Sequence, residues 1–188
     1  ESIKGVVHLS SLAAAGPSKE GQWVDEARPL SPLTFYGQSK KAGEEVALKY
    51  SASFPVKVIR PPVVYGPREE NLYTFFKLIK QGWGLQIGRS PKKLSLLYVT
   101  DLVKAMIAVC EPRSSKKKIY FVTDGATYSW KEVAKVAAQK MNVSIKAVLI
   151  PESILIPIAI FFEALAMLSA KPALFDRQRM IDIRQSCW

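Results

Sequence analysis

The most constraining feature of the sequence is a short apolar run, Val6–Leu9, that ends at Ser10-Ser11 and a stretch of small residues. A strand buried inside a parallel sheet is typically a continuous apolar run. In open α/β sheets, the groups that bind and react gather just beyond the carboxyl ends of such strands. Ser11 therefore lies at a position where reactive groups are usually found in such folds. The first expectation is a parallel α/β fold.

A helix is expected over residues 33–50, and it contains the pair Tyr36 and Lys40. Residues four apart on a helix lie on one face, so the phenol and the ammonium point the same way. A neighbouring cation favours the phenolate form of a phenol, which suits proton exchange with an alcohol or a ketone. Further along this helix an apolar stripe is expected to be buried, and Glu44 and Glu45 are expected to face water.

The rest of the chain alternates strand and helix patterns. Val56–Ile59 is expected to be a strand, and the Pro61-Pro62 step after it predicts an extended, rigid loop that could form the wall of a pocket. Asp101 is expected to cap a helix over 102–110, and Ser129 with Glu132 forms a capping box for a helix through Lys140. Further strands are predicted at 94–99, 119–122 and 147–150, and further helices at 71–81 and 172–184.

The segment Gly82–Gly88 superficially resembles a glycine-rich dinucleotide-binding loop. Such a loop must follow a strand and open a helix, whereas this segment follows a predicted helix and runs into a Pro/Lys-rich turn. It is therefore not interpreted as a cofactor-binding loop.

The stretch Ile154–Leu168 is strongly apolar but contains Pro157 and Glu163. It is shorter than the roughly 20 residues that span a bilayer. We expect a packed helix of a lobe that covers the substrate, with a helix at a membrane surface or a partner as the alternative.

Composition narrows the range of partners. The net charge is +11, but the lysine clusters lack interleaved aromatic residues and adjoin turn residues, so nucleic acid is not expected as a partner. The two cysteines and the single His8 offer no zinc-like or disulfide pattern, so no metal site is expected. A reducing, cytoplasmic compartment fits this cysteine usage.

The order and spacing of these motifs resemble the extended short-chain dehydrogenase/reductase family. The resemblance rests on a strand followed by Ser-Ser, a Tyr-x-x-x-Lys helix, a strand with Arg60-Pro61-Pro62-Val63-Val64-Tyr65-Gly66-Pro67, and Tyr98-Val99-x-Asp101 opening a helix. This family contains NAD(P)-dependent sugar epimerases and dehydratases and 3β-hydroxysteroid-dehydrogenase-like enzymes. It implies a Rossmann-like, doubly wound parallel sheet with a small, mainly helical substrate lobe.

The resemblance also implies roles for individual residues. Ser11 would be the catalytic serine, with Ser10 as the alternative, and Tyr36 would be the catalytic acid/base. Lys40 would favour the Tyr36 phenolate and bind the nicotinamide ribose of NAD or NADP. Pro61–Val64, including Pro61, Val63 and Val64, would line the nicotinamide site.

One part of the family pattern is not found in this chain. The glycine-rich loop that holds the cofactor pyrophosphate has no valid counterpart, and the residue that distinguishes NAD from NADP is absent with it. We therefore expect the C-terminal part of a longer enzyme, inactive as an isolated piece. Residues 1–125 are expected to be the C-terminal part of the dinucleotide domain, with interleaved lobe segments, and residues 126–188 to be mainly substrate-lobe helices.

The substrate remains open at this point. A nucleotide sugar is favoured by the basic charge and by Arg89, whereas a lipophilic alcohol is favoured by the apolar stretch 154–168. A non-catalytic binding subunit that keeps the fold is the alternative from another class. A homo-oligomer is compatible with either reading.

Overall fold

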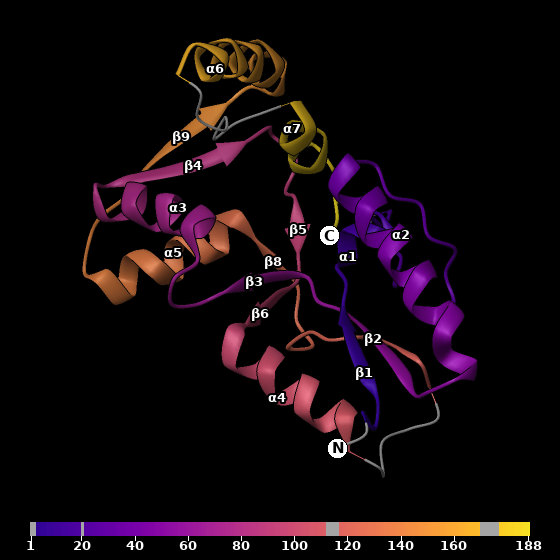
Figure 1. Ribbon diagram of the computed structural model, residues 1–188. Helices are drawn as coiled ribbons and strands as arrows, with labels where there is room; N and C mark the ends of the chain where they lie inside the picture. The colour runs from indigo at the N-terminus through magenta and orange to yellow at the C-terminus, as the bar shows by residue number, and fades with distance from the viewer. Residues whose placement is uncertain (1–2, 20, 112–116, 170–176) are drawn as a thin grey trace. The chain divides into compact units, whose positions relative to one another are not determined.

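The computed structural model describes residues 3–19, 21–111, 117–169 and 177–188. The chain divides into two compact units (Figure 1). Unit 1 contains residues 1–68, 94–127 and 187–188, and unit 2 contains residues 69–93 and 128–186. The expected functional division between residues 125 and 126 stays a prediction, because compactness by itself assigns no function.

Unit 1 is built on a parallel three-stranded sheet. Its strands are β1 (Val6–Leu9), β2 (Val56–Arg60) and β7 (Ile119–Phe121), in the order β1-β2-β7. The register pairs Val6 with Val56 and Val58 with Ile119. The α/β class and the parallel arrangement are thus confirmed.

Helices cover both faces of this sheet. The helices of unit 1 are α1 (Leu12–Ala15), α2 (Phe35–Lys49) and α4 (Val99–Cys110), and a 3-10 turn, η1 (Tyr50–Ala52), follows α2. Figure 1 shows α2 and α4 on opposite sides of β1 and β2. On the α4 side, buried Ile59 packs with Leu97 and Leu102. On the α2 side, His8 of β1 approaches Gly43.

Several expectations about unit 1 were wrong. The apolar stripe of α2 is not buried, since Val46 and Tyr50 are each 54% exposed. The Pro61-Pro62 step does not lead into an irregular loop, because β3 (Val63–Tyr65) resumes at once and pairs in parallel with β6 (Leu96–Tyr98). The two prolines thus separate β2, which pairs with β1 and β7, from β3, which pairs with β6 in another sheet. Asp101 does not cap α4: the helix begins at Val99 with Tyr98 as N-cap, and Asp101 lies in the first turn, 2.9 Å from Lys104 Nζ.

Unit 2 has a parallel pair of strands and four helices among its described residues. They are α3 (Glu70–Lys80), β4 (Trp83–Ile87), α5 (Trp130–Met141), β9 (Lys146–Ile150), the 3-10 turn η2 (Glu152–Ile154), α6 (Leu155–Ser169) and α7 (Arg177–Ile183). Gly82–Gly88 thus contains a strand, β4, whose Trp83 pairs with Lys146 of β9. Two short strands, β5 (Lys93–Leu94) and β8 (Tyr128–Ser129), lie where the chain passes from one unit to the other.

Two small cores hold unit 2 together. Ile79 of α3 is fully buried against Ala134 and Ala138 of α5, and the capping box of Ser129 and Glu132 opens α5 as predicted. The second core joins Leu155 and Ala159 of α6 to Met180 of α7. Of the expected helix at 172–184, residues 172–176 lie outside the described residues.

Helix α6 is strongly apolar apart from Glu163, and Phe161 is 61% exposed. Glu163 anchors it to α7, because its carboxylate lies 2.9 Å from Arg177 Nε. None of the helices, over the residues that the structure describes, is long and apolar enough to cross a membrane.

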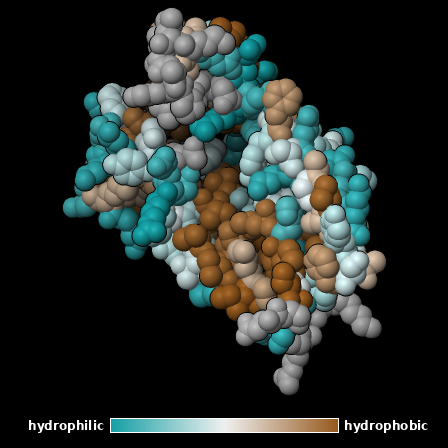
Figure 2. All heavy atoms as spheres, in the orientation of Figure 1, coloured by the Kyte–Doolittle hydropathy of each residue, from teal (hydrophilic) through white to brown (hydrophobic). Residues whose placement is uncertain are grey.

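An apolar surface lies over α4 and β1 on the face of unit 1 shown in Figure 2. Exposed apolar side chains on these two elements are Val6, Leu9, Val103 and Ile107, of which Ile107 is 60% exposed. Strand β1 is also one of the two edge strands of its sheet, among the residues described.

Candidate active site

The carboxyl end of β1 turns directly into α1, and Ser11 lies at this turn. Ser10 N–H donates to the Ile59 carbonyl oxygen (2.8 Å), which extends the β1–β2 ladder by one step. Ser11 is the N-cap of α1, and its Oγ accepts a hydrogen bond from Ala13 N–H at 3.1 Å. Ser11 is partly exposed, so its hydroxyl remains available to a ligand beyond the strand end.

Helix α2 begins against this turn. Thr34 caps it by accepting the Gly37 N–H at its hydroxyl oxygen (3.3 Å). A Cβ at Gly37 would lie 2.5 Å from the Ala13 carbonyl oxygen, so only glycine permits this approach. The first turn of α2 therefore rests on α1, whose N-cap is Ser11.

Tyr36 and Lys40 lie in the first two turns of α2, as the sequence predicts. Lys40 Nζ lies 5.7 Å from the centroid of the Tyr36 ring and donates a hydrogen bond to the Leu9 carbonyl oxygen (3.3 Å). The Tyr36 side chain is 54% exposed. A solvent-accessible phenol with a cation held beside it is thus placed near the carboxyl end of β1.

The three residues expected to line a nicotinamide site lie at the end of β2 and in β3. The Pro61 carbonyl oxygen accepts Leu12 N–H (2.8 Å), which places this proline beside Ser11. Val63 pairs with Leu96, and Val64 packs against the cluster of Ile59, Leu97 and Leu102. Backbone and side-chain hydrogen bonds thus bring together Ser11, Lys40 and Pro61 at the carboxyl ends of β1 and β2. Val64, by contrast, packs in part toward the core.

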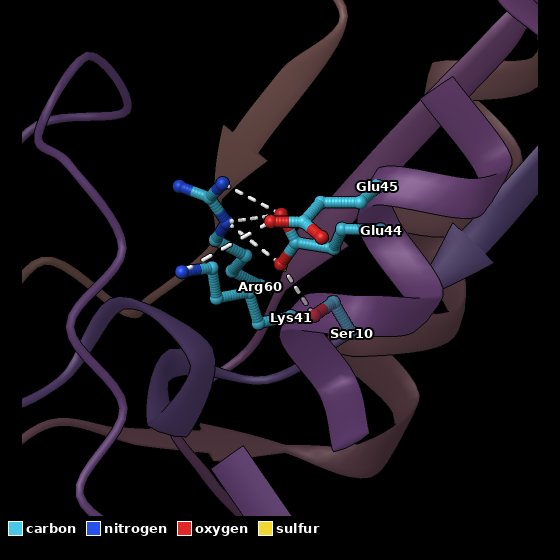
Figure 3. A network of polar contacts seen from close by, with 5 residues as sticks. All are labelled: Ser10, Lys41, Glu44, Glu45 and Arg60. Atoms are coloured by element: carbon cyan, nitrogen blue, oxygen red, sulfur yellow. Dashed lines mark hydrogen bonds and ion pairs between the residues drawn. The ribbon is translucent and has the colours of Figure 1, made fainter. Parts of the chain in front are cut away.

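Beneath these residues lies a buried charged network that sequence reasoning missed (Figure 3). Glu44 was expected to face water, but it is 1% exposed and lies between Ser10 and Arg60, each 3% exposed. Arg60 Nε donates to Glu44 Oε1 (2.9 Å), Arg60 Nη2 donates to Oε2 (2.6 Å), and the Ser10 hydroxyl donates to Oε1 (2.5 Å). No local signal in the sequence indicates this network, because it depends on the approach of Arg60 from β2.

Groups that could hold a cofactor or a metal differ between the two units. The exposed Tyr36 phenol and the Lys40 ammonium lie near the carboxyl end of a parallel strand, where open α/β sheets bind their ligands. Gly82–Gly88 does not fit the pyrophosphate, because it follows α3 and forms β4. No group of three or more His, Cys, Asp or Glu side chains is placed to hold a metal in the described part of the chain.

Unit 2 contains a separate cavity of about 360 Å³. It is lined by Gly88, Arg89, Ser90, Leu149, Pro151 and Glu152. Arg89 therefore lines a cavity of unit 2 and provides a positive charge there.

Comparison with known proteins identifies the class. Among solved structures, UDP-glucose 4-epimerase of Thermus thermophilus in complex with NAD superposes with a TM-score of 0.67 at 24% identity, covering 79% of this chain and 51% of that one. This likeness shows a Rossmann-type fold.

Residues 1–123 match the NAD dependent epimerase/dehydratase family, and the chain belongs to that family. The N-acetyl-alpha-D-glucosaminyl-diphospho-ditrans,octacis-undecaprenol 4-epimerase of Escherichia coli is 26% identical over 154 residues, which is 79% of this chain and 46% of that protein. Ceramide reductase of Caulobacter vibrioides is 24% identical over 182 residues, covering 96% of this chain and 52% of the reductase. The chain thus spans about half the length of these relatives.

Proposed function

We propose that the protein is an NAD(P)-dependent enzyme that interconverts a secondary alcohol and its ketone on a nucleotide-linked or diphosphate-linked sugar, as an epimerase, dehydratase or oxidoreductase. The observation that carries this proposal is the Tyr36–Lys40 pair. Its ammonium is anchored to the Leu9 carbonyl oxygen and its phenol is exposed beside the end of β1.

Each residue of the proposed site has a separate task. Tyr36 exchanges the hydroxyl proton of the substrate, and Lys40 keeps a positive charge beside the phenol and binds the cofactor ribose. Ser11 donates a hydrogen bond that fixes the substrate oxygen, and Pro61 with Val63 and Val64 forms one wall of the site. NAD or NADP, when bound, supplies or accepts the hydride.

A sugar diphosphate is the substrate class that we favour. The family is one of epimerases and dehydratases, and the Escherichia coli relative is named for a sugar joined to a lipid through a diphosphate. The net charge of +11 suits an anionic ligand, and Arg89 supplies a positive charge in the unit 2 cavity that it lines together with Glu152. The free thiols of Cys110 and Cys187 suit the expected reducing compartment.

A lipophilic alcohol is the second candidate. The match to ceramide reductase covers 96% of this chain, whereas the match to the epimerase covers 79%. Helix α6 adds exposed apolar side chains, Ile160 and Phe161 among them, that could contact an alkyl chain.

The test compares Tyr36→Phe with the wild type in the natural full-length protein. UDP-galactose with NAD and ceramide with NADP serve as the two probes. We expect turnover of the accepted probe to fall about 10²–10⁴-fold, the usual contribution of a general acid/base, with cofactor still bound. Tyr50→Phe is a matched control, since Tyr50 on the same segment is also 54% exposed. Undiminished turnover of Tyr36→Phe would refute the proposed role.

A further inference from the structure

We infer that Glu44 is a positioning residue for the proposed reaction: its buried carboxylate joins the three chain segments that carry the site. This inference rests on the proposed function. The Ser10 hydroxyl, the Arg60 guanidinium and helix α2 all meet at this one side chain (Figure 3).

The energetics of the pair argue against a purely stabilising role. Arg60 and Glu44 are both almost completely buried, at 3% and 1% exposure of their side chains. Removing two charges from water costs free energy that their attraction offsets only in part, so apolar replacement of a buried ion pair is often neutral or stabilising. Stability alone therefore does not explain this buried ion pair. Its contribution is a fixed geometry, because four hydrogen bonds hold the groups that meet at Glu44.

The position of Glu44 on α2 determines what this geometry controls. Glu44 follows Lys40 by one turn, so the two side chains lie on the same face of the helix. Binding of the Glu44 carboxylate by Arg60 fixes the rotation of α2 about its own axis. That rotation determines where Lys40 and Tyr36 point.

The other two partners extend this control to the remaining segments. Ser10 immediately precedes Ser11, and its donated hydrogen bond holds the end of β1 against Glu44 (2.5 Å). Arg60 immediately precedes Pro61, and the Phe121 ring lies 5.5 Å from its guanidinium carbon. One carboxylate thus fixes the serine, the tyrosine–lysine helix and the proline wall relative to one another.

This arrangement also separates the roles of the two serines. Ser10 is 3% exposed and its hydroxyl is engaged with Glu44, whereas Ser11 is partly exposed. Ser10 is therefore a positioning residue, and Ser11 is the serine that is available to a substrate.

The decisive experiment separates positioning from stability. In the natural full-length protein, Glu44→Met combined with Arg60→Met replaces the ion pair with apolar side chains. We expect the thermal midpoint to stay within about 5 °C of the wild type. We expect kcat for the probe accepted in the Tyr36 experiment to fall about 10–100-fold, because small displacements of reacting groups have effects of this size. The KM for NAD should change less than about threefold. A fall in kcat with a nearly unchanged KM is the result expected when the reacting groups are misplaced but the cofactor still binds.

Two further variants complete the design. Ser10→Ala removes only the hydroxyl donor and should lower kcat several-fold while lowering the thermal midpoint by no more than about 10 °C, so it decides the matter if the double variant does not fold. Glu45→Gln is the matched control: Glu45 is the next residue on α2, it is exposed, and its carboxylate lies 4.0 Å from Lys41 Nζ. Glu45→Gln should leave kcat unchanged.

The inference would be overturned if the folded double variant had the kcat of the wild type. If the double variant does not fold, a wild-type kcat in Ser10→Ala would overturn it instead. The Tyr36→Phe variant, measured alongside, distinguishes this result from failure of the proposed function itself. An active Tyr36→Phe protein refutes the catalytic assignment, whereas an inactive one together with a fully active double variant refutes only the positioning role.

Discussion

Lys40 Nζ donates a hydrogen bond to the carbonyl oxygen of Leu9, the last residue of β1, over 3.3 Å. The bond fixes a cation at the carboxyl end of a parallel strand and ties α2 to the sheet. It leaves two of the three ammonium protons available for other acceptors. The same lysine lies 5.7 Å from the centre of the Tyr36 ring, so it can serve a ligand and the phenol together.

Replacement of Lys40 by Met should therefore impair both tasks. We expect kcat with the accepted probe to fall about 10²-fold or more, and the KM for NAD to rise, because the variant loses a charge beside the phenol and a donor for the cofactor. Steady-state kinetics of the natural full-length protein would measure both. Lys41→Met is the matched control, since Lys41 forms only a surface ion pair with Glu45. Equal kcat in Lys40→Met and wild type would contradict this prediction.

Gly37 should not tolerate a side chain. Gly→Ala within a helix usually stabilises by about 0.5–1 kcal/mol. At Gly37, however, the new Cβ would lie 2.5 Å from the Ala13 carbonyl oxygen and 2.9 Å from Pro32 Cβ. Overpacking of this kind costs about 1–3 kcal/mol, so Gly37→Ala should be less stable than the wild type.

Urea unfolding would measure this effect, and kcat should fall with it because α1 and α2 carry Ser11 and Tyr36. Gln38→Ala, at the exposed neighbouring position, should change the unfolding free energy by less than about 0.5 kcal/mol. A Gly37→Ala protein more stable than the wild type would show that α1 does not rest on α2 in this way.

The capping box of α5 should make unit 2 sensitive to acid. Hydrogen bonds from the Ser129 backbone N–H and then from its hydroxyl hold the pKa of Glu132 below its ordinary value of 4.5, and the charge of Lys93 acts in the same direction. A carboxylate whose pKa is lowered in the folded state stabilises fully above its unfolded pKa and loses that contribution as pH falls through the folded pKa.

Glu132→Gln should accordingly be less stable than the wild type at neutral pH, and the difference should shrink below about pH 4.5. Urea unfolding at a series of pH values would show the convergence. A difference that stays constant down to pH 3 would mean that the Glu132 carboxylate contributes nothing through its charge.

Local signals in the sequence were sufficient for much of the fold. The apolar runs of β1 and β2 and the capping box of α5 depend on nearest neighbours along the chain, and the structure has them where expected. The Tyr36–Lys40 spacing likewise placed both residues on α2, because helical periodicity is a local property.

The features that sequence reasoning missed depend on tertiary contacts. Glu44 has the composition of a solvent-facing residue, and only the approach of Arg60 from β2 allows its burial. Strand β3 is short and follows two prolines, so its identity depends on β6 beside it. Asp101 was a sound candidate for a cap, but α4 begins three residues earlier than its pattern indicated.

The pairing of β4 with β9 has a consequence for how the chain is made. Trp83 pairs with Lys146, and between these strands the chain leaves unit 2 to supply α4 and β7 to unit 1. During synthesis β4 must therefore remain without its partner until β9 has left the ribosome, although β1, β2 and β7 of unit 1 have all been made by then. Long-range parallel pairing of this kind is slow to form. The nascent chain could thus pair β1, β2 and β7 beside Ser11 before β4 pairs with β9 in unit 2. During that interval, exposed β4 is the segment that a chaperone would have to protect.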